Sequence, residues 1–158
     1  MSKRISAGLI AGATAILLAP SPSPVNALDL TKQTPIEVRV ELGTAEGKHT
    51  FVPNALSFET GKLYKLVLSN PSKIKHYFTS PGLARSVHTR KVQVIDKKGT
   101  TAEIKGTIRE IEVYPGGTAE WWFVPVAAGR FEDLHCHIKD GDGRTHAQHG
   151  MTGTVEIR

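Results

Sequence analysis

Short runs of apolar and β-branched residues recur along the chain, each ended by a turn signal, and this pattern restricts the chain to an all-β fold. In the clearest run, at 36–42, Ile36, Val38, Val40 and Leu42 alternate with charged residues. Further runs lie at 51–58, 62–69, 88–96, 107–117, 118–126, 130–138 and 152–158, and no amphipathic helix is predicted. Seven or eight strands in a chain of this length predict a β-sandwich of Greek-key type.

The first 27 residues have the features of an export signal. Lys3 and Arg4 precede an apolar run of fifteen residues, 5–19, and a Pro/Ser-rich stretch then ends in small residues up to Ala27. The run is shorter than the roughly 20 residues that cross a bilayer, although an uncleaved membrane anchor is the alternative. We expect a signal peptide at 1–27, one domain at 28–158 and no stable membrane insertion after cleavage. The protein would then lie in a periplasm, a thylakoid lumen or the extracellular medium.

The charge of the predicted mature chain is modest. Without Lys3 and Arg4, 18 basic residues stand against 15 acidic ones, a net charge of about +3. The basic residues are scattered and no nucleic-acid motif is present, so nucleic acid is excluded as a partner. A mildly basic surface favours an acidic protein partner.

Metal-ligating residue types are concentrated at residues 135–151, which read HCHIKDGDGRTHAQHGM. This segment holds four of the seven histidines, the only cysteine and one of the two methionines. An exported protein with one cysteine forms no internal disulfide, and histidines on both sides make a poor apolar core. A metal-bound thiolate is the better interpretation. A thiolate, imidazoles and a thioether together select copper among the common metals.

At these positions the chain resembles the cupredoxins, the small blue copper proteins, and the corresponding domain of multicopper oxidases. The resemblance is carried by NPSKIKHYF at 70–78, PVAAGRFEDLHCHI at 125–138 and HAQHGMTGTVEI at 146–157. It implies a type 1 site for one copper ion, cycling between Cu(I) and Cu(II). Its ligands would be His76, Cys136 and His146, with Met151 as the weak axial ligand.

The chain departs from that family in the loop after the cysteine. Nine residues separate Cys136 from His146, where the family has only a few. The segment 138–145, IKDGDGRT, is turn-forming and charged, and we expect a surface excursion that leaves the ligands in place. His149 is the alternative to His146 as ligand.

The histidines beside the cysteine are predicted to point away from the metal. In an extended strand, His135 and His137 lie on the face opposite Cys136. In multicopper oxidases such neighbours bind a coupled copper cluster, which needs further His-x-His pairs that this sequence lacks. A second metal site there is the minor alternative. His49 and His88 receive no role. Core-facing positions 131 and 134, three apart, predict a β-bulge near 132–133.

The function that the resemblance favours is one-electron transfer between redox protein partners outside the cytoplasm. The protein would not be an enzyme, and His146, expected to lie near the surface, would be the electron port. The main alternative is a copper carrier, a sensor or an assembly factor for an oxidase. An enzyme with copper open to substrate is a third interpretation, and it needs a vacated axial position or a second metal.

Overall fold

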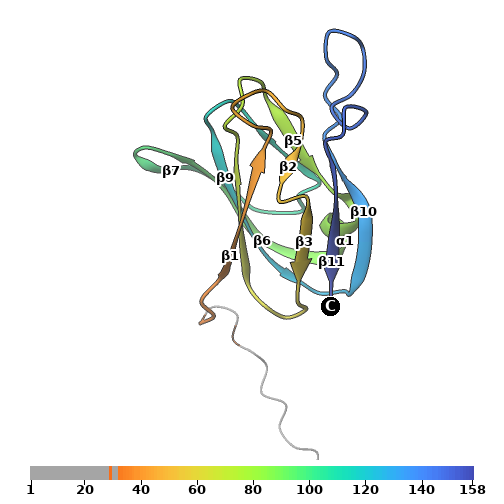
Figure 1. The fold of residues 1–158 in the computed structure, drawn as a ribbon. Coiled ribbons are helices and arrows are strands. Elements are labelled where there is room, and N and C mark those ends of the chain that lie inside the picture. Colours follow the sequence, from red (N-terminus) through yellow and green to blue (C-terminus); the bar gives the residue numbers. More distant parts are fainter. Residues whose placement is uncertain (1–28, 30–31) are drawn as a thin grey trace, which may run out of the picture.

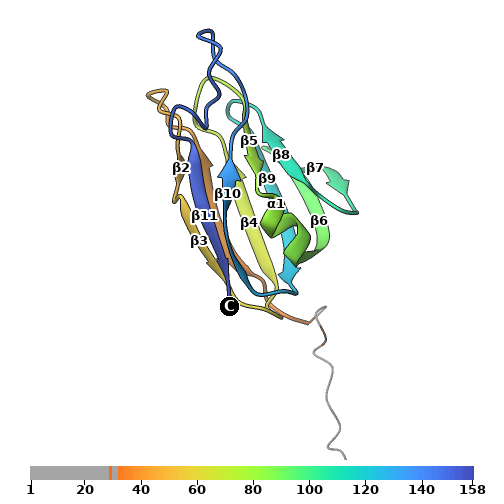
Figure 2. The ribbon, with the colours of Figure 1, turned by 90° about the vertical axis from the view of Figure 1, so that its right-hand side faces the viewer.

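Two β-sheets pack face to face in the computed structural model, which describes Asp29 and residues 32–158 (Figures 1 and 2). One sheet has six strands in the order β2 (Phe51–Val52), β1 (Ile36–Leu42), β4 (Tyr64–Ser69), β9 (Thr118–Pro125), β6 (Val87–Asp96) and β7 (Gly99–Ile104). The other has five strands in the order β3 (Ala55–Phe58), β11 (Thr152–Ile157), β10 (Gly129–His135), β5 (His76–Thr79) and β8 (Glu110–Val113). The pairs β1–β4 and β3–β11 are parallel, and the other pairs are antiparallel.

The predicted all-β sandwich is confirmed, with eleven strands in the described residues rather than seven or eight. The run 51–58 divides at Pro53 into β2 and β3, which pair in different sheets. Strand β7, exposed along its whole length, and strand β5 carry no clear alternation, and the sequence prediction missed both. The predicted signal peptide, 1–27, lies outside the described residues. Within the described part, no helix is long and apolar enough to cross a membrane.

The core between the sheets is built from alternating side chains. In β1, Val40 and Leu42 are fully buried while Glu41 between them is exposed, as the period of two requires. Burial of such apolar surface is the main term that stabilises the sandwich. The largest buried aromatic side chains come from both sheets: Phe51, Phe58, Phe78, Trp121 and Phe123.

The predicted β-bulge is present in β10, where the register with β11 shifts between Phe131 and Leu134. The bulge turns the carboxylate of Asp133 toward the one helix of the described chain, α1 (Pro81–Ser86), which the sequence prediction missed. Asp133 accepts hydrogen bonds from the Ser80 hydroxyl (2.7 Å) and from the Gly82 N–H (2.6 Å). One carboxylate therefore binds the first turn of α1 to the sheet.

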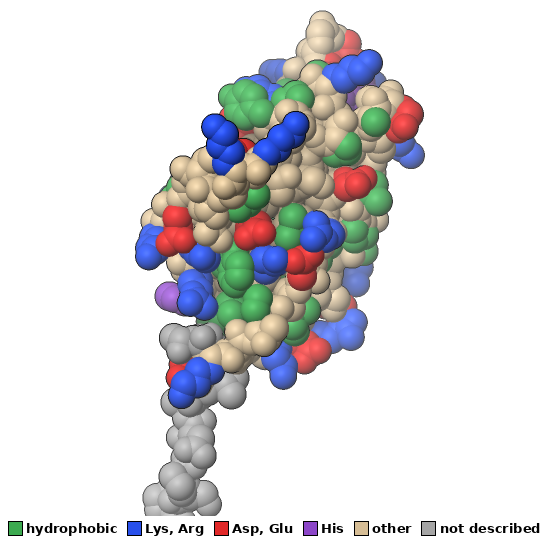
Figure 3. All heavy atoms as spheres, turned by 90° about the vertical axis from the view of Figure 1, so that its left-hand side faces the viewer, with side chains coloured by type: hydrophobic (Ala, Val, Ile, Leu, Met, Phe, Trp, Pro, Cys, Tyr) green, Lys and Arg blue, Asp and Glu red, His purple; other side chains and the backbone are tan. Residues whose placement is uncertain are grey.

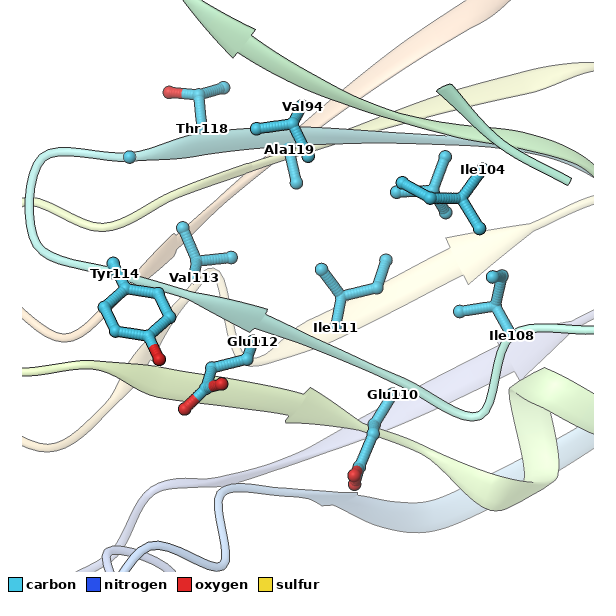
Figure 4. Close-up of a pocket in the computed structure, with 12 residues that line it drawn as sticks. Val94, Ile104, Ile108, Glu110, Ile111, Glu112, Val113, Tyr114, Thr118 and Ala119 are labelled. Carbon is cyan, nitrogen blue, oxygen red and sulfur yellow. The ribbon is translucent and has the colours of Figure 1, made fainter. Parts of the chain in front are cut away.

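An apolar pocket of about 420 Å³ lies between the edges of the two sheets. Figure 4 shows Ile111 and Val113 of β8 pointing toward Val94 and Ala119 of the opposite sheet. Glu110 and Glu112 point away from this apolar cluster, as alternation along β8 requires. The pocket lining contains no histidine, cysteine or methionine, so its chemistry is that of packing and not of metal binding.

The outer face of the six-stranded sheet carries charges of both signs (Figure 3). Lys65 pairs with Glu37 and lies 3.8 Å from Glu120, and Lys91 pairs with Glu103 at 3.2 Å. Basic and acidic side chains are interspersed here. This face therefore presents no extended patch of one sign.

We predict that Asp133→Ala lowers the free energy of unfolding by about 2–4 kcal/mol, because two hydrogen bonds to a charged acceptor are lost. Urea unfolding of the metal-free protein measures the change. The control is Glu132→Ala, since that exposed neighbour only approaches Arg130 at 3.5 Å. Equal destabilisation by the two substitutions would contradict the assigned role of Asp133.

Candidate metal centre

Three loops meet at the end of the sandwich opposite the C-terminus, and the loop between β10 and β11 projects beyond the others (Figure 1). His76 is the first residue of β5, and Cys136 directly follows β10. Backbone hydrogen bonds attach the end of the long loop to Cys136. The Cys136 N–H donates to the Met151 carbonyl, and the Ala147 N–H donates to the Cys136 carbonyl. The Met151 N–H donates to the His146 carbonyl, so these backbone bonds bring Cys136, His146 and Met151 together.

The donor atoms converge on one point. His76 Nδ1 lies 3.1 Å from His146 Nδ1, and Cys136 Sγ lies 4.0 Å and 3.3 Å from these two nitrogens. These separations place one point about 2 Å from all three atoms, which is the length of a bond from a metal ion to imidazole nitrogen. The side chains of all three residues are buried, as is that of Met151. The geometry therefore fits one small cation.

The orientation of His76 is set by Ser72. The Ser72 hydroxyl lies 2.9 Å from His76 Nε2, and its single proton is used toward Asn70 Oδ1 (2.7 Å) or the Ile74 carbonyl (2.8 Å). The hydroxyl oxygen is therefore left to accept the hydrogen bond from Nε2–H. This fixes the tautomer of His76 and leaves the Nδ1 lone pair facing the metal position.

The other imidazole, that of His146, is held by a carboxylate, and its Nε2 also carries the proton. His146 Nε2–H donates to Asp140 Oδ1 (3.1 Å), because a carboxylate can only accept. Both Nδ1 lone pairs consequently face each other at 3.1 Å with the sulfur beside them. Three electron-rich atoms held at one buried point are what a bound cation would stabilise.

The thiol of Cys136 is also prepared for a metal. Burial raises the pKa of Cys136, while backbone N–H groups of Tyr77 and Ile138 oppose the rise, the first at 3.3 Å from Sγ. The raised pKa keeps the thiol protonated near neutral pH in the metal-free protein. A metal ion bound here would displace that proton, and the Tyr77 N–H would stabilise the thiolate.

Burial disfavours the protonated form of both imidazoles. Burial, followed by the nearby His146 and His49, lowers the pKa of His76 to about 4, and burial also lowers the pKa of His146. Protons therefore compete weakly with a metal ion for the Nδ1 atoms at neutral pH.

No family model matches the sequence, and no curated protein matches it. Solved structures do. A multicopper oxidase from Pediococcus acidilactici is 20% identical, with a TM-score of 0.55, over 91% of this chain and 30% of the oxidase. "Multicopper oxidase from Campylobacter jejuni: a metallo-oxidase" is 19% identical, with a TM-score of 0.50, over 80% of this chain and 31% of the oxidase.

The protein has the cupredoxin fold. The chain spans about a third of the length of these oxidases, and the likeness concerns the fold alone. Within this fold, His76, Cys136, His146 and Met151 form a cluster whose donor atoms and burial suit one copper ion.

The structure places the remaining histidines of 135–151 away from the donor atoms. His135 and His137 lie on the face opposite the buried Cys136, as alternation predicted, and the His137 ring stacks on Tyr77. His149 pairs with Asp142 at 3.2 Å, whereas His146 supplies the nitrogen beside the sulfur. The expectation that His146 lies near the surface is wrong: its exposed fraction is 0%, because neighbouring loops cover it.

Sequence reasoning gave no role in this site to His49 or Asp140. His49, in the loop between β1 and β2, stacks on the His146 ring with centroids 4.1 Å apart. One nitrogen of each of His49, His76 and His146 lies within 4.8 Å of the others, a group able to hold a metal. His49 Nε2 pairs with Asp140 (2.8 Å), so we assign His49 to the cover of the site and Cys136 to the ligand set. No local pattern signals this long-range contact.

We predict that the metal-free protein loses stability as pH falls from 7 to 4.5. The pKa of His76 is about 4 in the folded chain against about 6.5 when unfolded, so the unfolded state binds more protons in this interval. The contribution of neutral, buried His76 to the free energy of unfolding is present above pH 6.5 and is lost toward pH 4. Urea unfolding at the two pH values should show a loss of about 2 kcal/mol from this residue. His76→Gln should lack that part of the loss, and an identical pH dependence would contradict the assignment.

We predict that Gly43→Ala lowers copper affinity by about 10- to 100-fold, the usual effect of disturbing a ligand's support. Gly43 has φ +74°, and a Cβ there would lie 2.6 Å from His76 Nε2. Gly47→Ala is the matched control, because Gly47 has φ +89° in the same loop and no atom within 4 Å of a Cβ. Competitive copper titration measures both variants. Equal affinities would show that the close approach to His76 is unimportant.

Proposed function

We propose that this cupredoxin is an exported one-electron carrier with a type 1 copper site. His76, Cys136, His146 and Met151 would hold the ion. The observation that carries the proposal is the convergence of two Nδ1 atoms and one Sγ within 4.0 Å at a buried point. One thiolate, two imidazoles and a thioether are the donor set of blue-copper electron-transfer sites.

The chain's own contribution is to fix the ligands before the metal arrives. Ser72 and Asp140 hold the remote nitrogens of His76 and His146, and the Tyr77 N–H holds the sulfur. Burial excludes water from the ligands His76, Cys136 and His146. A bound copper ion would supply the exchange of one electron between its two oxidation states. Ligands held in this way change little between those states, which keeps the reorganisation small.

The partners that we propose are redox proteins. The net charge of the predicted mature chain is about +3, from 18 basic and 15 acidic residues, which favours an acidic surface on the partner through long-range attraction. Export to a periplasm, a thylakoid lumen or the medium is supported by the signal-like residues 1–27. Salt should therefore slow association with the natural partner.

The cupredoxin fold by itself does not separate an electron carrier from an enzyme, because solved chains with a similar fold include multicopper oxidases. The residues beside the site favour an electron carrier over an enzyme. His135 Nδ1 already approaches its own strand at the Asp133 carbonyl (2.7 Å), and its ring lies 6.2 Å from that of His137. Met151 is fully buried, so no open coordination position faces solvent. A copper carrier or sensor without electron shuttling would give a colourless or readily exchanged metal.

We predict that the copper-loaded protein has an intense visible band and cycles reversibly by one electron, and that Cys136→Ser abolishes the band. The band requires a thiolate on the metal, and the sandwich core keeps the variant folded. His137→Ala, which alters the next residue on the opposite face, should retain the band. Visible spectroscopy and voltammetry test the set. A colourless copper-loaded wild-type protein would refute the electron-carrier function. An unchanged Cys136→Ser spectrum would refute the assignment of Cys136 as a copper ligand.

A further inference from the structure

The long segment between Cys136 and His146 forms a small folded unit over the metal centre. Lys139 and Thr145 form an antiparallel bridge, and the Asp140 N–H donates to the Arg144 carbonyl (2.8 Å). The Gly143 N–H donates back to the Asp140 carbonyl (2.9 Å), and Gly143 has φ +81°, which glycine adopts without strain. The backbone of this turn therefore holds Asp140 at a defined place.

The Asp140 carboxylate joins two loops above the metal position. Its Oδ1 accepts from His146 Nε2 at 3.1 Å, and its Oδ2 pairs with His49 Nε2 at 2.8 Å. The His49 ring lies almost parallel to that of His146, with an interplanar angle of 21°. Together they leave His146 without exposed surface, although the Asp140 side chain itself is 30% exposed.

We propose that Asp140 is a positioning residue for the copper site, a role that rests on the proposed function. It holds the Nε2–H of His146 so that Nδ1 faces the ion, and its negative charge favours the oxidised ion. With His49 it also covers the edge of the histidine ring. The segment 138–145, expected to be a surface excursion that leaves the ligands in place, thus also contributes a carboxylate that supports one of them.

The physical reason is that the Asp140 carboxylate acts on the metal position through the imidazole ring of His146. A carboxylate on the remote nitrogen of a ligating histidine fixes the tautomer and makes the ring more electron-donating. Greater donation and a nearby negative charge both stabilise Cu(II) more than Cu(I), so the reduction potential falls. A carboxylate elsewhere on the loop acts only through the solvent-screened field, which is weaker.

The first test compares two acids of the same turn. Asp140→Asn removes the charge at His146 with almost no change of shape. Asp142→Asn removes a charge that contacts the Arg144 N–H and His149 and, in the described part of the chain, makes no hydrogen bond to His146. Voltammetry should show a higher potential for Asp140→Asn, with about a tenfold shift of the redox equilibrium toward Cu(I), which is about 59 mV. Asp142→Asn should shift it much less. An equal shift in the two variants, or none in Asp140→Asn, overturns the proposal.

The second test uses no copper. Nitrogen-15 spectra of the metal-free wild-type protein should show His146 protonated at Nε2 and unprotonated at Nδ1. Asp140→Ala should give a mixture of tautomers, because the acceptor is gone. Protonation of wild-type His146 at Nδ1 would overturn the positioning role even if the copper form is blue. A colourless wild-type copper form would instead refute the carrier function, so the two failures are distinguishable.

Discussion

The buried side chain of Asn70 is the constraint on which the metal centre depends. Its Nδ2 donates to the carbonyls of Ile74 and Val113, both at 2.8 Å, and its Oδ1 accepts from the N–H and hydroxyl of Ser72. These bonds join the loop before β5 to the end of β8. Because every polar atom of the amide is paired, a fully buried polar residue is tolerated here. The network also places the Ser72 oxygen against His76.

The ligands differ in how firmly the fold itself holds them. His76 begins β5 and Cys136 follows β10, so the pairing of the five-stranded sheet sets their separation. His146 and Met151 belong to a loop, whose backbone bonds to Cys136 and Ile138 replace strand pairing. Asp140 and His49 then hold the loop's histidine from outside. The strand ligands need little side-chain support beyond Ser72, whereas the loop ligand needs a carboxylate.

Burial shifts the pKa values of the imidazoles and of the thiol in opposite directions. It lowers the pKa of His76 and His146, which keeps their lone pairs available. It raises the pKa of Cys136, which keeps the thiol neutral until a cation arrives. Both effects disfavour an isolated buried charge, and both are removed when one positive ion is shared by the three atoms.

The sequence by itself determined the class of fold and the chemistry of the site. Alternation at 36–42 and the spacing of Phe131 and Leu134 indicated strands and a bulge, because side-chain direction in a strand depends only on position along it. The donor types and their order indicated copper. Only the tertiary structure decided that Pro53 divides one run between two sheets, that β7 exists, and that His146 is buried under Asp140 and His49. Those outcomes depend on contacts between distant loops, which no local period or spacing encodes.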